Sequence, residues 1–254
     1  MTIAWVRQPS ARLEGCELSF LAREPIDARR ALEQHAGYVR TLGELGCEVR
    51  WLPELPSHPD GVFVEDTAVI APELAVVTRP GAAARRAEVE SVAQALAGHV
   101  PVARIEAPGT LEGGDVLQVG RTFYVGASAR SNAQGMEQLR GHLAPHGYAV
   151  RAVPMHGCLH LKSAVTFVPP DLLLLNPGWV EARDFEAARV VPVDPTEPYG
   201  ANTLTVAGTT LVSAAYPRTR ERLAALGLAL RTLPVDELHK AEAALTCMSL
   251  LLEG

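Results

Sequence analysis

The sequence lacks the features of secreted, membrane-spanning and nucleic-acid-binding proteins. The first residues, MTIAWVR, have neither the basic n-region nor the long apolar h-region of a signal peptide. No apolar run approaches the about 18 residues that a spanning helix needs. The net charge is −6, the isoelectric point is near 5.8, and no basic stripe is present. We therefore expect neither a nucleic-acid partner nor a membrane partner.

Cysteine is scarce and scattered. The four cysteines, Cys16, Cys47, Cys158 and Cys247, show no CxxC and no spacing of a disulfide framework. This usage is typical of reduced thiols, and we expect a cytoplasmic protein. No low-complexity, Ser/Gly-rich or charge-block segment divides the chain, and 48% of its residues are apolar. The composition therefore predicts one domain over residues 1–254.

A repeated pattern organises the chain. Each unit has an apolar strand, a turn, a second apolar strand, a helix and a third strand. Four units span residues 61–105, 110–154, 158–193 and 201–235. A fifth begins near residue 245, and its helix and third strand lie at the other end of the chain, in residues 28–55. Such a repeat predicts a ring closed by the N- and C-terminal segments.

The repeat predicts an α/β fold, a five-bladed pseudo-symmetric propeller of ββαβ units. Helical positions show three- and four-residue apolar spacing, and Gly46, Gly147 and Gly227 stand where a left-handed C-cap is expected. Closure would protect strand edges and hold both termini. A plain parallel α/β sheet is the alternative, but the short hairpin turn in each unit disfavours it.

Polar residues occupy one register of the repeat. Asp66, Asp115, Ser163, Asn202 and Cys247 each directly precede the apolar part of a first strand. Glu112 lies three residues before Asp115, and His160 lies three before Ser163. In a pseudo-symmetric ring these positions meet at one mouth of the central channel.

This set of side chains suits nucleophilic catalysis. We hypothesise that Cys247 is the nucleophile, which needs a base or a cationic neighbour because a free thiol is mostly protonated at neutral pH. His160 could transfer protons, and Glu112 could fix its tautomer and orientation. The simpler interpretations are a buried structural thiol at Cys247, a hydrogen-bonded core histidine at His160 and an exposed Glu112.

Asp60, Glu65 and Asp66 add negative charge to the predicted mouth. Buried carboxylates need cationic partners, and a guanidinium has a planar fork of donors that matches them. The sequence therefore favours a small cationic guanidino substrate, whose charge would also lower the pKa of the thiol. Glu65 and Asp66 could instead form a solvated turn.

Two other classes of function remain open. His156, Cys158 and His160 offer possible metal ligands, although their spacing lacks the pairing of standard zinc motifs. A non-catalytic protein that binds arginine-like ligands would also use the same carboxylates.

Six ordered motifs resemble the dimethylarginine dimethylaminohydrolases of the guanidino-group-modifying superfamily. They are FVEDTAV (63–69), TRPGAAARR (78–86), LEGGDV (111–116), VGASARSN (125–132), LHLKS (159–163) and LTCMS (245–249). The resemblance implies the same propeller and the hydrolysis of methylated L-arginine to L-citrulline and an alkylamine. It implies covalent attack by Cys247, proton transfer by His160 and orientation of His160 by Glu112.

The resemblance also implies roles for the remaining site residues. Asp66, Glu65 and Asp60 would hold the substrate nitrogens, while Arg85 and Arg130 would hold its carboxylate; Arg86 is the alternative to Arg85. Residues Gly15–Glu24 would form a mobile lid with Leu18 over the substrate. No cofactor and no metal are implied, and the protein would be a monomer or homodimer.

One position separates members of the superfamily. Arginine deiminases typically carry an acid two residues after the histidine, where this chain has Lys162. The resemblance therefore implies low activity on unmethylated arginine.

Overall fold

The strands form five separate three-stranded sheets in the computed structural model, which describes residues 1–186 and 189–253. In each sheet the second strand of the unit lies in the middle. The sheets are β3 (Ala68–Ala71), β4 (Leu74–Val77) and β5 (Val102–Arg104); β6 (Val116–Val119), β7 (Thr122–Gly126) and β8 (Ala149–Val153); β9 (Val165–Val168), β10 (Leu172–Leu175) and β11 (Arg189–Pro192); β12 (Leu204–Val206), β13 (Thr209–Ser213) and β14 (Ala229–Leu233); and β15 (Leu250–Leu252), β1 (Ile3–Val6) and β2 (Glu48–Trp51).

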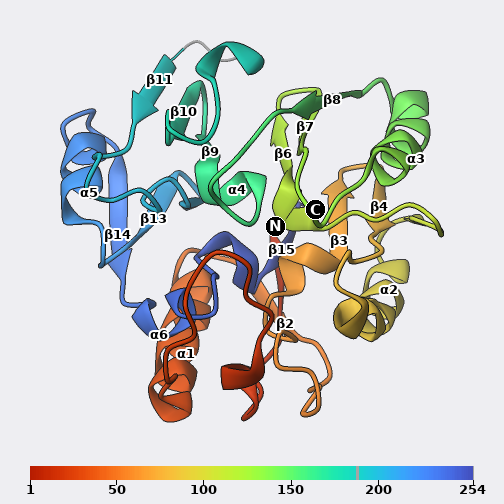
Figure 1. Cartoon of the computed structure of the whole chain (residues 1–254), viewed down its shortest axis with the longest axis horizontal. Coiled ribbons are helices and arrows are strands. Elements are labelled where there is room, and N and C mark those ends of the chain that lie inside the picture. Colours follow the sequence, from red (N-terminus) through yellow and green to blue (C-terminus); the bar gives the residue numbers. More distant parts are fainter. Residues whose placement is uncertain (187–188, 254) are drawn as a thin grey trace.

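All five sheets share one topology. The first strand pairs antiparallel with the second, and the second pairs parallel with the third. Four sheets place a helix on the outside of the ring (Figure 1), namely α1 (Ala28–Glu44), α2 (Val89–Ala97), α3 (Ala133–Leu143) and α5 (Pro217–Ala224). The predicted five-bladed α/β propeller is therefore confirmed.

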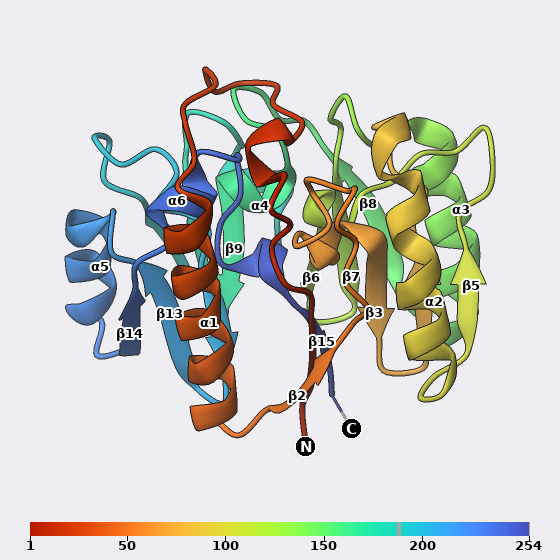
Figure 2. The same ribbon diagram turned by 90° about the horizontal axis from the view of Figure 1, so that it is seen from below.

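The fifth sheet joins the two ends of the chain. β1 pairs antiparallel with β15 and parallel with β2, so the N-terminal strand stands between the C-terminal strand and the strand that follows α1. The repeat pattern identified the helix and third strand of this unit but not β1 as its second strand. Figure 2 shows both termini on one face and the loop between β1 and α1 on the opposite face.

Local sequence explains where α1 begins and ends. Asp27 caps its N-terminus by accepting a hydrogen bond from the amide of Arg30, which stabilises a helix by about 1 kcal/mol. The helix ends at Glu44, and Gly46 then adopts φ +89°, which a residue with a side chain rarely does. Gly147 and Gly227, at φ +77° each, confirm the predicted left-handed caps.

The first strands are shorter than the repeat pattern predicts. Most begin only after a helical turn, and Cys247 itself lies in such a turn, not at the start of a strand. The reason is geometric: neighbouring residues of a strand face opposite sides, whereas a helical turn can bury both Glu65 and Asp66. The helix expected near residues 181–188 is one turn, Ala182–Asp184; residues 187 and 188 lie outside the described part of the chain.

Apolar contacts between neighbouring sheets hold the ring together. One buried cluster joins Val69 and Val76 of the first unit to Val116, Phe123 and Leu139 of the second. Burial of this kind contributes about 25 cal/mol per Å² of apolar surface and fixes the sheets against one another. Among the described helices, none is long and apolar enough to cross a membrane.

Candidate active site

Short helical turns bring the polar side chains to the centre of the ring. η2 (Val64–Thr67) contacts both η4 (Gly113–Asp115) and η7 (Thr246–Met248), and α4 (Leu161–Ala164) contacts η4. Asn202 links two of them, since its amide group donates to the carbonyl of Lys162 at 2.9 Å and accepts from the amide of Thr246 at 3.1 Å. Residues that share one register of the repeat therefore lie together.

A cavity lies between these turns and the loop before α1. Its volume is about 10 Å³, room for about one water molecule. Six of the residues predicted from the sequence line it, namely Asp60, Asp66, Arg85, Arg130, His160 and Cys247. Three others, Glu112, Glu65 and Leu18, are outside its lining as far as the described residues show.

Several residues that line the cavity were not predicted. They are Phe63, Leu159, Ala241, Glu242 and Ala243; Glu17 also lines the cavity but belongs to the predicted lid Gly15–Glu24. Phe63 and Leu159 begin two of the sequence motifs, so their position in those motifs could have identified them. Glu17 and Glu242 belong to irregular segments, where no periodic pattern gives the direction of a side chain.

His160 is buried between two carboxylates. Its Nε2 lies 2.7 Å from Oε2 of Glu112, and its Nδ1 lies 3.8 Å from Oδ1 of Asp66. Burial opposes a charged ring, but Asp66, Asp115 and Glu112 outweigh it and raise the pKa of His160 to about 9. At neutral pH the ring therefore carries a proton that it can donate.

Glu112 supports His160 from behind and is fully buried. Burial would raise the pKa of its carboxyl, but the hydrogen bond and charge of His160, with Arg85 and Arg130, hold that pKa far below its usual range. Its Oε1 also accepts the amide of Gly81 at 3.0 Å. An ionised, fixed carboxylate of this kind can orient an imidazole.

Cys247 shares the cavity with His160. Burial, and after it the charges of Glu65 and Asp66, raise the pKa of the Cys247 thiol to about 12, although the amide of Ala244 donates to Sγ at 3.4 Å. The side chain is therefore a neutral thiol at neutral pH. A positive charge brought into the cavity would favour the thiolate.

Asp66 is bound to Arg85 inside the protein. Nη1 of Arg85 donates to Oδ2 of Asp66 at 2.6 Å, and Nη2 lies 3.0 Å from Oε2 of Glu88. Arg86 is exposed, and its Nε donates to the carbonyl of Pro80. Arg85, not Arg86, therefore lines the cavity. Its contact with a substrate carboxylate stays a prediction, because two protein carboxylates already hold its guanidinium.

Arg130 has longer contacts. Its Nη1 lies 3.4 Å from both carboxylate oxygens of Glu112, and its Nη2 lies 3.4 Å from Oγ of Ser19. Such lengths mark weak hydrogen bonds. Arg130 is thus better placed than Arg85 to take up a further carboxylate.

Asp60 closes the side of the cavity nearest the loop before α1. Its two oxygens accept the amide of Glu17 at 3.3 and 3.2 Å. Burial raises the pKa of Asp60 to about 6, against the opposing charge of Arg85. Leu18 is half-buried and packs against an apolar cluster that includes Phe63, so its contact with a substrate stays a prediction.

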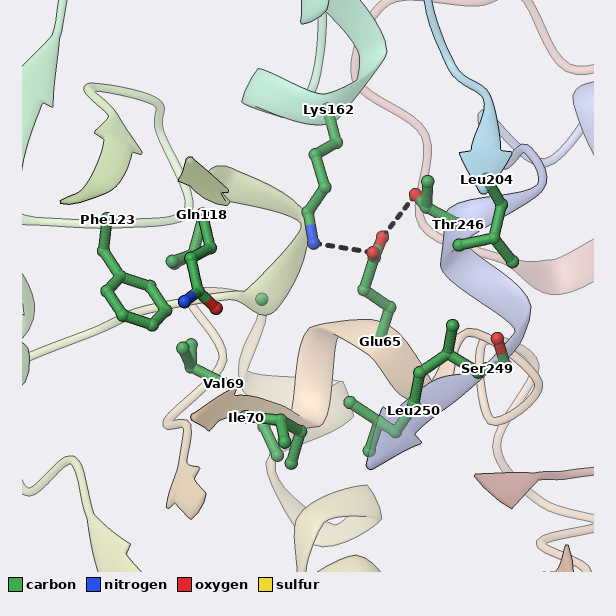
Figure 3. A pocket seen from close by; sticks show the side chains of 14 residues that line it. Glu65, Val69, Ile70, Gln118, Phe123, Lys162, Leu204, Thr246, Ser249 and Leu250 are labelled. Carbon is green, nitrogen blue, oxygen red and sulfur yellow. Dashed lines mark hydrogen bonds and ion pairs between the residues drawn. The ribbon is translucent and has the colours of Figure 1, made fainter. Parts of the chain in front are cut away.

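Glu65 faces away from the cavity. Its Oε1 accepts from Lys162 at 2.6 Å and its Oε2 from the hydroxyl of Thr246 at 2.6 Å (Figure 3). These groups border a second pocket, of about 200 Å³, among the first strands β3, β6 and β15. Glu65 is thus a neutralised carboxylate behind Cys247, and its direct contact with a substrate stays a prediction.

Asp115 connects the segments of two site residues, His160 and Glu112. Its carboxylate accepts from the amide of Leu161 at 3.1 Å and from the hydroxyl of Ser131 at 2.6 Å. The Ser131 hydroxyl in turn accepts the amide of Glu112 at 3.1 Å. This network ties the segments of His160 and Glu112 together, which explains why an acid stands at this register although it does not line the cavity.

The glycine pair before Asp115 permits a close approach of Asp66 and His160 to the backbone. A Cβ atom on Gly114 would lie 2.7 Å from Oδ1 of Asp66 and 2.8 Å from Nδ1 of His160. The amide of Gly114 also donates to Asp66 at 3.0 Å. A side chain here would force these two functional groups apart.

Asp66, Glu112 and His160 are the one described group whose ligand atoms lie close enough, within 4.8 Å, to hold a metal ion. A metal ion bound by a ring nitrogen of His160 would have to replace a proton of the charged ring. The metal set suggested by the sequence is not assembled: His156 is exposed, while the buried thiol of Cys158 lies 3.5 Å from the carbonyl of His160.

Comparison with known proteins gives one consistent family. A family model described as N,N dimethylarginine dimethylhydrolase, eukaryotic, matches residues 16–187. The chain is 37% identical to the N(G),N(G)-dimethylarginine dimethylaminohydrolase of Pseudomonas aeruginosa, covering 96% of each chain. It is 41% identical to the enzyme of that name from Streptomyces coelicolor, covering 98% of this chain and 96% of the relative.

Comparison with solved structures gives the same family. A cysteine-to-serine variant of the Pseudomonas aeruginosa protein complexed with citrulline gives a TM-score of 0.92 at 35% identity, covering 98% of each chain. A dimethylarginine dimethylaminohydrolase adduct with S-methyl-L-thiocitrulline gives 0.93 at 35% identity, over 99% of this chain and 100% of the other. The fold, the motifs and these similarities together show that the chain belongs to the dimethylarginine dimethylaminohydrolase family.

Proposed function

We propose that the protein hydrolyses Nω-methylated L-arginine, either asymmetric dimethylarginine or monomethylarginine, to L-citrulline and dimethylamine or methylamine. The observation that carries this proposal is the cavity that Cys247 shares with His160, where the ring of His160 is bonded to Glu112 at 2.7 Å. Family membership supports the substrate class.

Covalent attack by Cys247 is the first chemical step of the proposal. Binding of the guanidinium lowers the thiol pKa, the thiol releases its proton to solvent, and the thiolate Sγ forms a bond to the guanidinium carbon. Asp66 balances the positive charge of the guanidinium before attack, and addition of the thiolate gives a tetrahedral carbon with no net charge.

Departure of the amine follows. His160, charged at neutral pH, gives its proton to the alkylated nitrogen as the carbon–nitrogen bond breaks, so the amine leaves in neutral form. A covalent S-alkylthiouronium on Cys247 remains. The now neutral His160, held by Glu112, takes a proton from water as the oxygen adds to the carbon. The carbon–sulfur bond then breaks, the hydroxyl proton of the adduct passes to the departing thiolate, and citrulline is released with Cys247 neutral and His160 protonated.

Lys162 favours methylated substrates within this proposal. Its ammonium neutralises Glu65 behind the cavity, in place of the acid that arginine deiminases carry at this position. Fewer unpaired carboxylates surround the terminal guanidinium nitrogens, which suits an alkylated nitrogen with fewer N–H donors. Arginine deimination, or hydrolysis of another guanidine, is the alternative.

A parallel assay tests the proposal. Citrulline is measured colorimetrically with dimethylarginine, monomethylarginine and arginine, each with and without a chelator. We expect turnover of the methylated substrates, little on arginine and no effect of the chelator. Comparable turnover of arginine would contradict the assignment. Binding without citrulline would favour a binding protein, and activity restored by zinc after chelation would favour a metal hydrolase.

Replacing Gly114 with alanine tests the geometry of Asp66 and His160. We expect kcat to fall by roughly 100-fold, because displacement of reacting groups by about 1 Å costs this much. The matched control is Gly141→Ala, where a Cβ meets nothing within 4 Å on α3. Equal activity of the two variants would show that Asp66 and His160 do not need this close approach.

A further inference from the structure

The loop over the cavity is held at its tip by one carboxylate. The amides of Ser19, Phe20 and Leu21, three consecutive residues, all donate to the side chain of Glu242; for Ser19 the two oxygens lie at 3.0 Å each. Consecutive amides that converge in this way form an anion-binding concavity, and bonds to a charged acceptor are stronger than neutral ones.

Apolar burial does little to hold this tip. Ser19 is exposed and Phe20 is 52% exposed, while Leu21 is half-buried. The neighbouring described attachments are the amide of Glu17 on Asp60, the long Arg130 contact with Ser19, and the packing of Leu18 against an apolar cluster. Arg23 also donates to the carbonyl of Cys16 within the loop. The polar contact with Glu242 is therefore the main bond between residues 19–21 and the rest of the protein, and such a bond can open and close.

The backbone of Glu242 adopts an unusual conformation. Its φ is +55°, a region that side-chain-bearing residues other than asparagine and aspartate seldom occupy. Glu242 lies five residues before Cys247 and lines the cavity of the active site. It also lines the neighbouring pocket together with Leu21 and Cys247. The strained backbone thus places this carboxylate between the loop tip and the nucleophile.

The cavity under the loop is too small for an amino acid. With the loop in this position it has about 10 Å³, whereas ligand pockets for small molecules are many times larger. Any arginine-like molecule must therefore enter while residues 17–21 are displaced, and the contacts of Glu242 must break and form again in each cycle.

We propose that Glu242 is the latch of the active-site loop: a positioning residue whose carboxylate holds residues 19–21 closed beside Cys247. The latch follows from hydrogen bonds and cavity size alone. Its consequence for turnover rests on the proposed function, because only a cavity that admits a substrate needs to open and close.

Amide exchange tests the latch without any substrate. In Glu242→Ala, hydrogen exchange at Ser19, Phe20 and Leu21, followed by NMR, should be about tenfold faster, which corresponds to about 1.4 kcal/mol. Glu242→Gln keeps one acceptor oxygen, so its exchange rates should lie between those of the wild type and those of Glu242→Ala. Glu242→Gly relieves the backbone strain while removing the carboxylate, so it should exchange as fast as Glu242→Ala and remain folded. Glu221→Ala, which removes an exposed carboxylate of α5, is the control.

Two outcomes separate this inference from the proposed function. Unchanged exchange at all three amides in the alanine and glycine variants would overturn the latch, whatever the enzyme does. If exchange is faster as expected, the alanine and glycine variants should raise the KM for dimethylarginine about tenfold with a smaller change in kcat. The reason is that the closed loop holds the substrate before chemistry. Faster exchange in a protein that forms no citrulline would support the latch and contradict the proposed reaction.

Discussion

Cys247→Ser should lower the rate of citrulline release by roughly a thousandfold or more, because a serine hydroxyl at this position has no base matched to it. His160 is already protonated at neutral pH and cannot accept the hydroxyl proton. Incubation of the wild type with dimethylarginine followed by acid quenching and mass spectrometry should reveal the covalent intermediate, and the variant should form none.

The thiol of Cys47, which does not line the cavity, provides the matched control. It is buried in a cluster with Tyr38 and Leu42, away from the cavity lining. Cys47→Ala should keep turnover near that of the wild type while losing some stability through lost packing. If Cys247→Ser formed citrulline as fast as Cys47→Ala, thiol catalysis would be ruled out.

Asp66→Asn should have the largest effect on stability. Arg85 and Asp66 are both buried and lie 2.6 Å apart, so removal of one charge leaves the other less compensated. Breaking a buried pair of this kind costs roughly 3–5 kcal/mol. The free energy of unfolding, measured by denaturant titration, should fall by this amount. Substrate binding should fall as well, because the guanidinium loses a carboxylate partner.

The effect of Asp66→Asn should also depend on pH. The pKa of His160 is raised from 6.5 to about 9, so its charged form adds stability below pH 6.5 that is lost as the pH rises toward 9. Among the carboxylate charges that raise the pKa of His160, that of Asp66 has the largest effect. The pKa of His160 in the variant, measured by NMR, should therefore be lower than in the wild type. The part of the stability loss in Asp66→Asn that comes from His160 should therefore be greatest below pH 6.5 and shrink toward pH 9. At pH 9 the part that comes from the lost ion pair with Arg85 should remain.

An exposed ion pair offers a control for this variant. Asp171 and Arg189 lie 3.9 Å apart with side chains 38% and 48% exposed. Asp171→Asn should change the free energy of unfolding by no more than about 1 kcal/mol at any of these pH values. A comparable loss in both variants would mean that burial of the Asp66–Arg85 pair is not what makes it important.

The Asp66–Arg85–Glu88 group also explains how several acidic side chains can be buried around the cavity. Arg85 lies between two carboxylates, and Lys162 neutralises Glu65 on the far side. Burial, and after it the charges of Glu65 and Asp66, keep the thiol of Cys247 protonated until a cation arrives. In the proposed reaction, this couples formation of the nucleophile to binding of the guanidinium.

The sequence by itself determined the ring and most of its centre. The repeat of strand, turn, strand, helix and strand requires each unit to bury its apolar face on the next, which closes five units into a propeller. Because equivalent positions of a pseudo-symmetric ring meet on its axis, the shared register predicted that Asp66 and Cys247 lie around one cavity, with His160 three residues before the register position of its unit.

Only the tertiary structure decided how the charged side chains pair. Lys162 and Glu65 are 97 residues apart, and Ser19 and Glu242 are 223 apart. Long side chains at one register can point along the axis in either direction. Their partners depend on rotamers and on distances across the ring that no local pattern encodes. For this reason no local pattern showed that Glu65 pairs with Lys162 or that Glu242 binds the amides of residues 19–21. The contact of Glu65 with a substrate stays a prediction.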